Sequence, residues 1–73
     1  MDRNEIRRKT CVIIRKHGLY LAGRDWITDG LRWTWSTYEA WKTRDIETAR
    51  EIARRTGGIM VLFNPILGQT KVM

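Results

Sequence analysis

Cysteine, histidine, serine and proline each occur only once in this 73-residue sequence, and their scarcity excludes several kinds of site. Cys11 cannot form a disulfide within the chain, and Cys11 with His17 falls short of the four ligands that structural zinc takes. There is no apolar run of about 18 residues, and no apolar segment of signal-peptide type follows the N-terminus. We therefore expect no metal, no cofactor, no membrane association and a reducing, cytoplasmic compartment.

The same scarcity argues against an enzyme. Cys11 and His17 are separated by about 20 Å along one predicted strand, at ~3.3 Å per residue, so they cannot act as nucleophile and base. Asp29 is explained by a turn and Glu39 by a helix cap, while Asp25 has no evident acidic partner. We expect a non-catalytic binding protein.

Positive charge is in excess. The chain has 14 lysines and arginines against 8 aspartates and glutamates, a net charge of +6, and residues 1–16 hold six of the cations with only two carboxylates. An imbalance of this kind favours a polyanionic partner such as DNA or a nucleoprotein complex. A net charge of this size is also found in small proteins where it only maintains solubility, and both interpretations stay open at this point.

Apolar periodicity predicts an α+β fold with a mostly antiparallel sheet. A β-branched run at 11–14, a turn at His17-Gly18 and a second run at 19–23 indicate a hairpin. Residues 31–35 alternate, with Leu31, Trp33 and Trp35 on one face and Arg32 and Thr34 on the other. Residues 59–63 and 70–73 follow as strands. The predicted order is β-β-β-α-β-β, with one main helix packed on one face.

The main helix is predicted over residues 44–55. Ile46, Ala49, Ile52 and Ala53 fall on one arc, Thr43 is a candidate N-cap, and Gly57-Gly58 ends the helix. Upstream, Ser36-Thr37-Tyr38-Glu39 has the form of a capping box. It begins either a separate helical turn through Trp41 or one continuous helix from residue 37.

Two domain segments are expected. Residues 1–9 are polar and basic and predict a mobile arm, whereas 10–73 form a single α+β domain. Within it, residues 24–30 are either a loop or a continuation of the second strand.

One helix covers only one face of a sheet, yet the runs 11–14 and 59–63 are apolar at every position. The second face therefore needs cover from the loop that carries Trp26 and Ile27, the arm, a second copy of the chain or a partner. This need favours a recognition surface or a dimer.

Three binding hypotheses follow. Three strands followed by a helix is the order of β-sheet readers of DNA, such as plant ethylene-response domains and the arm-binding domains of tyrosine integrases, a fold-level analogy. Here the nucleic-acid contacts would be Arg7, Arg8, Lys9, Arg15, Lys16, Arg24, Arg32 and Thr34. Alternatively, Trp26, Tyr38 and Trp41 grip a host protein. A structural homodimer is the third possibility.

Several segments between residues 20 and 70 carry a resemblance to a known group. Leu31-Arg32-Trp33-Thr34-Trp35, the stretch 38–45, Ala49-Arg50 and Phe63-Asn64-Pro65 resemble small proteins carried by prophages and mobile elements of Gram-positive bacteria. The resemblance implies an accessory role: DNA handling, transcriptional control, or inhibition of a host system such as a CRISPR nuclease. It assigns no functional residue.

Overall fold

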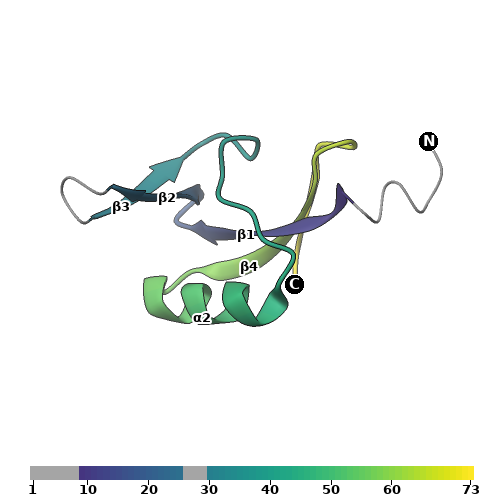
Figure 1. Cartoon of the computed structure of the whole chain (residues 1–73). Coiled ribbons are helices and arrows are strands. Elements are labelled where there is room, and N and C mark those ends of the chain that lie inside the picture. The colour runs from purple at the N-terminus through teal and green to yellow at the C-terminus, as the bar shows by residue number, and fades with distance from the viewer. Residues whose placement is uncertain (1–8, 26–29) are drawn as a thin grey trace.

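The computed structural model describes residues 9–25 and 30–73, which form a five-stranded antiparallel sheet and a helix (Figure 1). The elements are β1 (Cys11–Lys16), β2 (Leu19–Asp25), β3 (Gly30–Thr34), α2 (Ile46–Thr56), β4 (Ile59–Asn64) and β5 (Gln69–Val72). The strand order is β3-β2-β1-β4-β5, which places the two most apolar strands, β1 and β4, inside the sheet. The predicted α+β fold and order of elements are confirmed.

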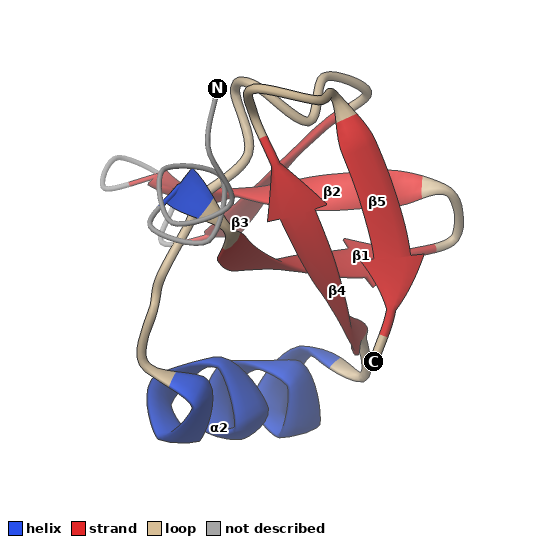
Figure 2. Cartoon of the chain, turned by 90° about the vertical axis from the view of Figure 1, so that its right-hand side faces the viewer, coloured by secondary structure: helices blue, strands red, loops and turns tan. Residues whose placement is uncertain are grey.

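The β1–β2 hairpin turns at the two residues that the sequence indicated. His17 and Gly18 both have positive φ, 52° and 78°, and they connect Lys16 to its cross-strand partner Leu19. Two consecutive residues in this region form the turn whose twist suits an antiparallel hairpin. The sheet as a whole is strongly twisted, and Figure 2 shows β4 and β5 running steeply across β1 and β2.

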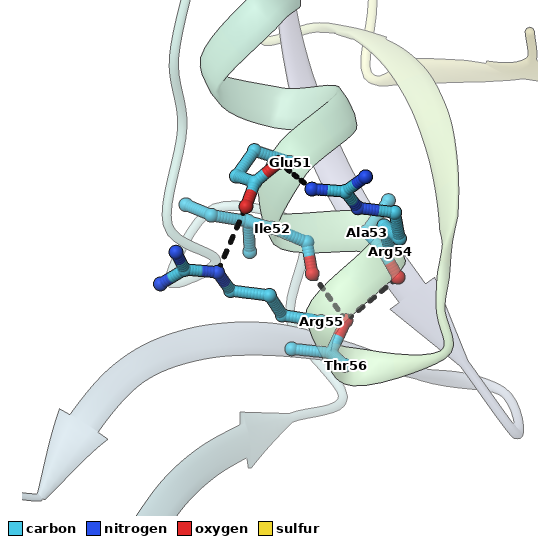
Figure 3. A network of polar contacts seen from close by, with 6 residues as sticks. All are labelled: Glu51, Ile52, Ala53, Arg54, Arg55 and Thr56. Carbon is cyan, nitrogen blue, oxygen red and sulfur yellow. Dashed lines mark hydrogen bonds and ion pairs between the residues drawn. The ribbon is translucent and has the colours of Figure 1, made fainter.

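Helix α2 is closed at both ends by local contacts. The Asp45 side chain accepts hydrogen bonds from the amides of Glu47 and Thr48, and Gly57 ends the helix in the left-handed conformation, with φ 73°. On the exposed side Glu51 pairs with two arginines of the last turn, and the Thr56 hydroxyl donates to carbonyls of the same turn (Figure 3). The helix was predicted over residues 44–55 with Thr43 as its cap; it begins two residues later, ends one residue later and is capped by Asp45.

The helix covers one face of the sheet. Val12 and Ile14 of β1 are buried there against Ala49 and Ala53 of α2, together with Leu21 of β2. Half-buried side chains complete this cluster; they are Trp33, Trp41, Ile52, Met60 and Leu62. The small alanine side chains allow the helix backbone to approach the sheet closely. The predicted apolar arc of the helix faces the core, except for Ile46 at its start, which is exposed.

The opposite face has its own buried cluster, without a helix. Cys11 and Ile13 of β1 lie beside Phe63 and Val61 of β4, and all four are buried together with Ala40. Part of the cover comes from the segment between β3 and α2: Ala40 packs into the cluster, and the Tyr38 ring meets Phe63 edge-on at 5.4 Å. The described chain thus covers the central strands on both faces, and their burial needs no partner.

The β3–α2 connection is also built into the sheet. β1 pairs with β2 only at Arg15 and Lys16, next to the hairpin turn. Nearer the start of β1, the two strands separate and the segment 41–43 bonds to both of them. Thr43 exchanges two backbone hydrogen bonds with Val12, and the Trp41 amide donates to the Leu21 carbonyl at 2.7 Å. These bonds require extended backbone at 41–43, and therefore no helix forms here.

Two local predictions are corrected accordingly. Neither a separate helical turn through Trp41 nor a continuous helix from residue 37 is present; Ser36 accepts from the Glu39 amide in a non-helical turn, which is half of the expected capping box. The alternation in β3 also fails at its ends, because Leu31 is exposed and Trp35 lies beyond the strand with 81% of its surface exposed. Only Trp33 of that predicted face packs into the core.

Candidate nucleic-acid interface

The residues predicted to contact nucleic acid fall into separate places. Arg7 and Arg8, like Trp26 of the alternative protein interface, lie outside the described residues. Arg24 is described only by its backbone, which belongs to β2 opposite Leu31. The positions that can be compared with the prediction are Lys9, Arg15, Lys16, Arg32 and Thr34.

Two of these cations share one face of the sheet. Arg15 of β1 stands beside Tyr20 of β2, and Tyr20 stands beside Thr34 of β3, so the three form one cross-strand row. Arg32 precedes Thr34 by two residues and therefore points to the same face. Arg15 and Arg32, named here the sheet group, are exposed and unpaired with any described carboxylate.

Thr34 and Lys16 are engaged within the fold. The Thr34 hydroxyl donates to the Glu39 carboxylate at 3.2 Å and accepts from the Ser36 amide at 3.1 Å. Lys16 points to the face opposite Arg15, where its Nζ donates to the Thr56 carbonyl at 2.8 Å. A cation at this position satisfies an end carbonyl of α2 and suits the negative end of the helix dipole.

A second group of cations surrounds a hollow at the start of β1. Lys9, Lys42 and Arg44, named here the pocket group, line a hollow of about 350 Å³ with Cys11, Thr43 and Pro65. None of its lining residues is acidic. The Val12–Thr43 pairing creates this cluster, because it carries the two residues that flank Thr43 to the end of β1 where Lys9 stands.

The Cys11 thiol lies close to the positive charges of this hollow. Burial raises the pKa of Cys11, and the nearby charges of Lys42 and Arg44 partly oppose that rise by favouring the thiolate. The thiol itself donates to the Phe63 carbonyl at 3.4 Å and is buried, so it contributes to the core and not to a reactive surface.

Lys42 has a structural role as well. Its Nζ donates to the carbonyls of Tyr38 and Ala40 at 2.7 and 2.8 Å, and it lies 5.7 Å from the centre of the Phe63 ring. Lys42 therefore holds the segment that covers the second face. Lys9 and Arg44 are exposed, make no ion pair with a described carboxylate, and are the members available to a ligand.

The four acidic residues whose side chains the structure describes are engaged within the fold. Glu47 and Glu51 pair with arginines of α2, Asp45 caps that helix, and Glu39 accepts from Thr34. Hydrogen bonds from Thr48, and from the Glu47 amide to a smaller extent, lower the pKa of Asp45. Three of these four carboxylates belong to α2 or its cap, whereas Glu39 lies beside Thr34, at the end of the row that contains Arg15.

Two aromatic side chains stand out from the same connection. Trp35 is 81% exposed and Tyr38 is 61% exposed, although Tyr38 rests one edge on Phe63 and donates to the Pro65 carbonyl at 3.3 Å. Trp41, the third residue of the alternative protein interface, is half-buried in the helix-side cluster and belongs to the core.

The sequence prediction missed Lys42, Arg44 and Trp35. Lys42 and Arg44 are 33 or more residues from Lys9 along the chain, and only the pairing of Thr43 with Val12 brings them together. A possible signal was the alternation of Lys42-Thr43-Arg44, which is typical of an extended segment with charged side chains on one side. The predicted helical turn concealed it.

Comparisons with known proteins give no relative: the chain matches no family model, no curated protein and no solved structure. Within residues 9–25 and 30–73, no group of three His, Cys, Asp or Glu side chains is placed to hold a metal ion. No helix in that part of the chain has the length and hydrophobicity to cross a bilayer. The fold itself is that of a small α+β protein.

Proposed function

We propose that the protein binds nucleic acid through the pocket group and the sheet group, which contact backbone phosphates. The observation that carries the proposal is the hollow lined by Lys9, Lys42 and Arg44, with no acidic residue in its lining, at the start of β1. Unpaired lysines and arginines around a concave surface provide the charge that phosphates require.

The positions of the two groups also support an extended ligand. Cys11 and Arg15 lie on the same side of β1, so the hollow and the sheet group occupy opposite ends of one face. Cys11, which lines the hollow, and Arg15 are four residues apart in β1, about 13 Å at ~3.3 Å per residue. A nucleic acid that spans both groups would place several phosphates against the protein, and its binding would depend steeply on salt.

The proposal is tested by salt titration of binding to a fluorescently labelled oligonucleotide. Affinity should fall linearly with the logarithm of salt concentration, and the double variant Lys9→Gln/Arg44→Gln should bind more weakly with a slope reduced by about 1 to 2 units. The matched control is Arg50→Gln/Arg54→Gln, which removes the same charge from the exposed face of α2. Equal losses in the two variants, or binding that ignores salt, would contradict the proposal.

A protein-binding role, for example as an inhibitor of a host defence system carried by a mobile element, is the second candidate. Exposure of Trp35 and Tyr38 favours it, because large aromatics dominate the energetics of protein interfaces. Salt-insensitive capture of one host protein that is lost in the Tyr38→Ala variant would support this role over nucleic-acid binding. A homodimer would instead show a melting temperature that rises with protein concentration.

A further inference from the structure

Trp35 is the most exposed large hydrophobic side chain that the structure describes. Trp33 and Trp41 pack against the helix-side cluster, whereas 81% of Trp35 is exposed and its indole makes no hydrogen bond or ring contact with a described residue. Tryptophan is highly buried on average, so an indole left in water contributes little to this fold and is available to a ligand.

The position of Trp35 connects it to the sheet group. It directly follows Thr34, which ends the row of Arg15, Tyr20 and Thr34 across three strands. Strands are spaced by about 4.8 Å, so the backbones of Thr34 and Arg15 are roughly 10 Å apart. Arg32 stands on the same strand as Thr34 and points to the same face. The exposed ring therefore lies one residue beyond the strand that carries Arg32, at the start of the connection that carries Lys42.

An aromatic ring beside cations matches the chemistry of single-stranded nucleic acid. Bases stack on aromatic side chains without regard to sequence, while neighbouring cations follow the backbone. In a duplex the bases are already stacked on one another, and a side chain reaches a base face only after that stacking is broken. A protein partner could use the same indole, but the unpaired cations Arg32, on the preceding strand, and Arg15, two strands away, favour a polyanion.

We infer that the ligand is single-stranded nucleic acid, with a base stacked on the Trp35 indole while Arg15 and Arg32 contact adjoining phosphates. The inference rests on the proposed function and adds its substrate class. The pocket group then holds a more distant part of the same strand, and duplex binds only through its phosphates.

The test compares three labelled probes: a single-stranded oligonucleotide, the same oligonucleotide with abasic sites, and a duplex. Wild-type protein should prefer the single strand. Trp35→Ala should weaken single-strand binding by roughly 5- to 150-fold, the effect of one stacked base, and leave duplex binding unchanged. The abasic probe should bind wild type as weakly as the intact single strand binds Trp35→Ala, and Trp35→Tyr should retain much of the affinity.

Trp35 is exposed, so Trp35→Ala should melt at the wild-type temperature, which checks that a loss is not caused by unfolding. If Trp35→Ala weakens binding to single strand and duplex equally, or weakens neither, the inference is overturned. Salt-dependent binding by the same variant would still leave the proposed function standing. Absence of salt-dependent binding to all three probes overturns both. Loss of a captured protein in Trp35→Ala, without any loss of single-strand binding, would make Trp35 a protein anchor and overturn the inference.

Discussion

Replacing Lys42 with methionine removes a charge but keeps an unbranched side chain that can pack along the same path. The change deletes two hydrogen bonds, from Nζ to the carbonyls of Tyr38 and Ala40, and the contact of the ammonium group with the Phe63 ring. Hydrogen bonds from a charged group contribute about 1.5–3 kcal/mol each when buried, and a cation near a ring contributes about 0.5–1 kcal/mol at an exposed site.

Lys42 is only half-buried, so solvent screens these contacts and the sum has to be reduced. We expect Lys42→Met to lower the free energy of unfolding by about 2 kcal/mol. For a domain of this size each kcal/mol shifts the melting temperature by roughly 4–8 °C, so thermal unfolding followed by circular dichroism should show a decrease of about 10 °C.

Lys9→Met is the matched control, because Lys9 lines the same hollow, carries the same charge and is exposed. Its unfolding free energy should change by no more than about 0.5 kcal/mol. If Lys9→Met and Lys42→Met melt at the same temperature, the two carbonyl contacts do not stabilise the covering segment. The reasoning that gives Lys42 a structural role would then be refuted.

Three further predictions concern folding and can be checked by urea or thermal unfolding. Gly58→Ala should cost about 1–3 kcal/mol, because the new Cβ would lie 2.7 Å from Cγ2 of Ile14 and 3.0 Å from the Arg15 carbonyl; a wild-type midpoint would show that the two segments separate easily. Asn64→Ala should cost about 1–3 kcal/mol, since the buried amide bonds to Thr10 and accepts from two backbone amides of the β4–β5 turn; an unchanged midpoint would refute this. Because the pKa of Asp45 is lowered by folding, its contribution to stability is fully present above about pH 4 and is lost as pH falls through the folded-state pKa. The stability of Asp45→Asn should therefore depend less on acid pH than that of the wild type. Equal dependence in the two proteins would contradict the capping role.

Elements with strong local signals were predictable from the sequence. The β-branched runs became β1 and β4, and His17-Gly18 became the hairpin turn because both residues adopt the left-handed conformation there. The helix followed its apolar arc and ended at glycine. Its start was misplaced because Thr43 pairs through its backbone with Val12 of β1, and Asp45 caps the helix in its place.

The connection between β3 and α2 was the main failure, and its cause is long-range. Residues 36–39 carry a helix-start pattern, but the Glu39 carboxylate accepts from Thr34, and residues 41–43 are extended because they bond to β1 and β2. No property of the segment itself reveals those partners. Tertiary hydrogen bonds to two strands outweigh a weak local preference for helix.

The β3–α2 connection also covers the second face of the sheet, which the sequence did not reveal. Two apolar strands required shelter on both sides, as the sequence indicated, but the expected loop carrying Trp26 and Ile27 lies outside the described residues. The described cover is the connection itself, through Ala40 and Tyr38. The apolar strands alone therefore do not imply a partner, and the features of the surface that favour a ligand are its charge and Trp35.

Charge along the sequence is a poor guide to charge on this surface. Arg15 and Lys16 are adjacent in the chain, yet successive side chains of a strand point to opposite faces. Arg15 therefore lies on the face opposite α2, and Lys16 lies at the end of α2, where it bonds to Thr56. Conversely, Lys42 and Arg44 join Lys9 through a single bridge between Thr43 and Val12. The same segment positions the cations, closes the core and carries Trp35 at its start. A disturbance of this segment should therefore reduce stability and nucleic-acid binding together, whereas changes at Lys9, Arg44 or Trp35 should separate the two.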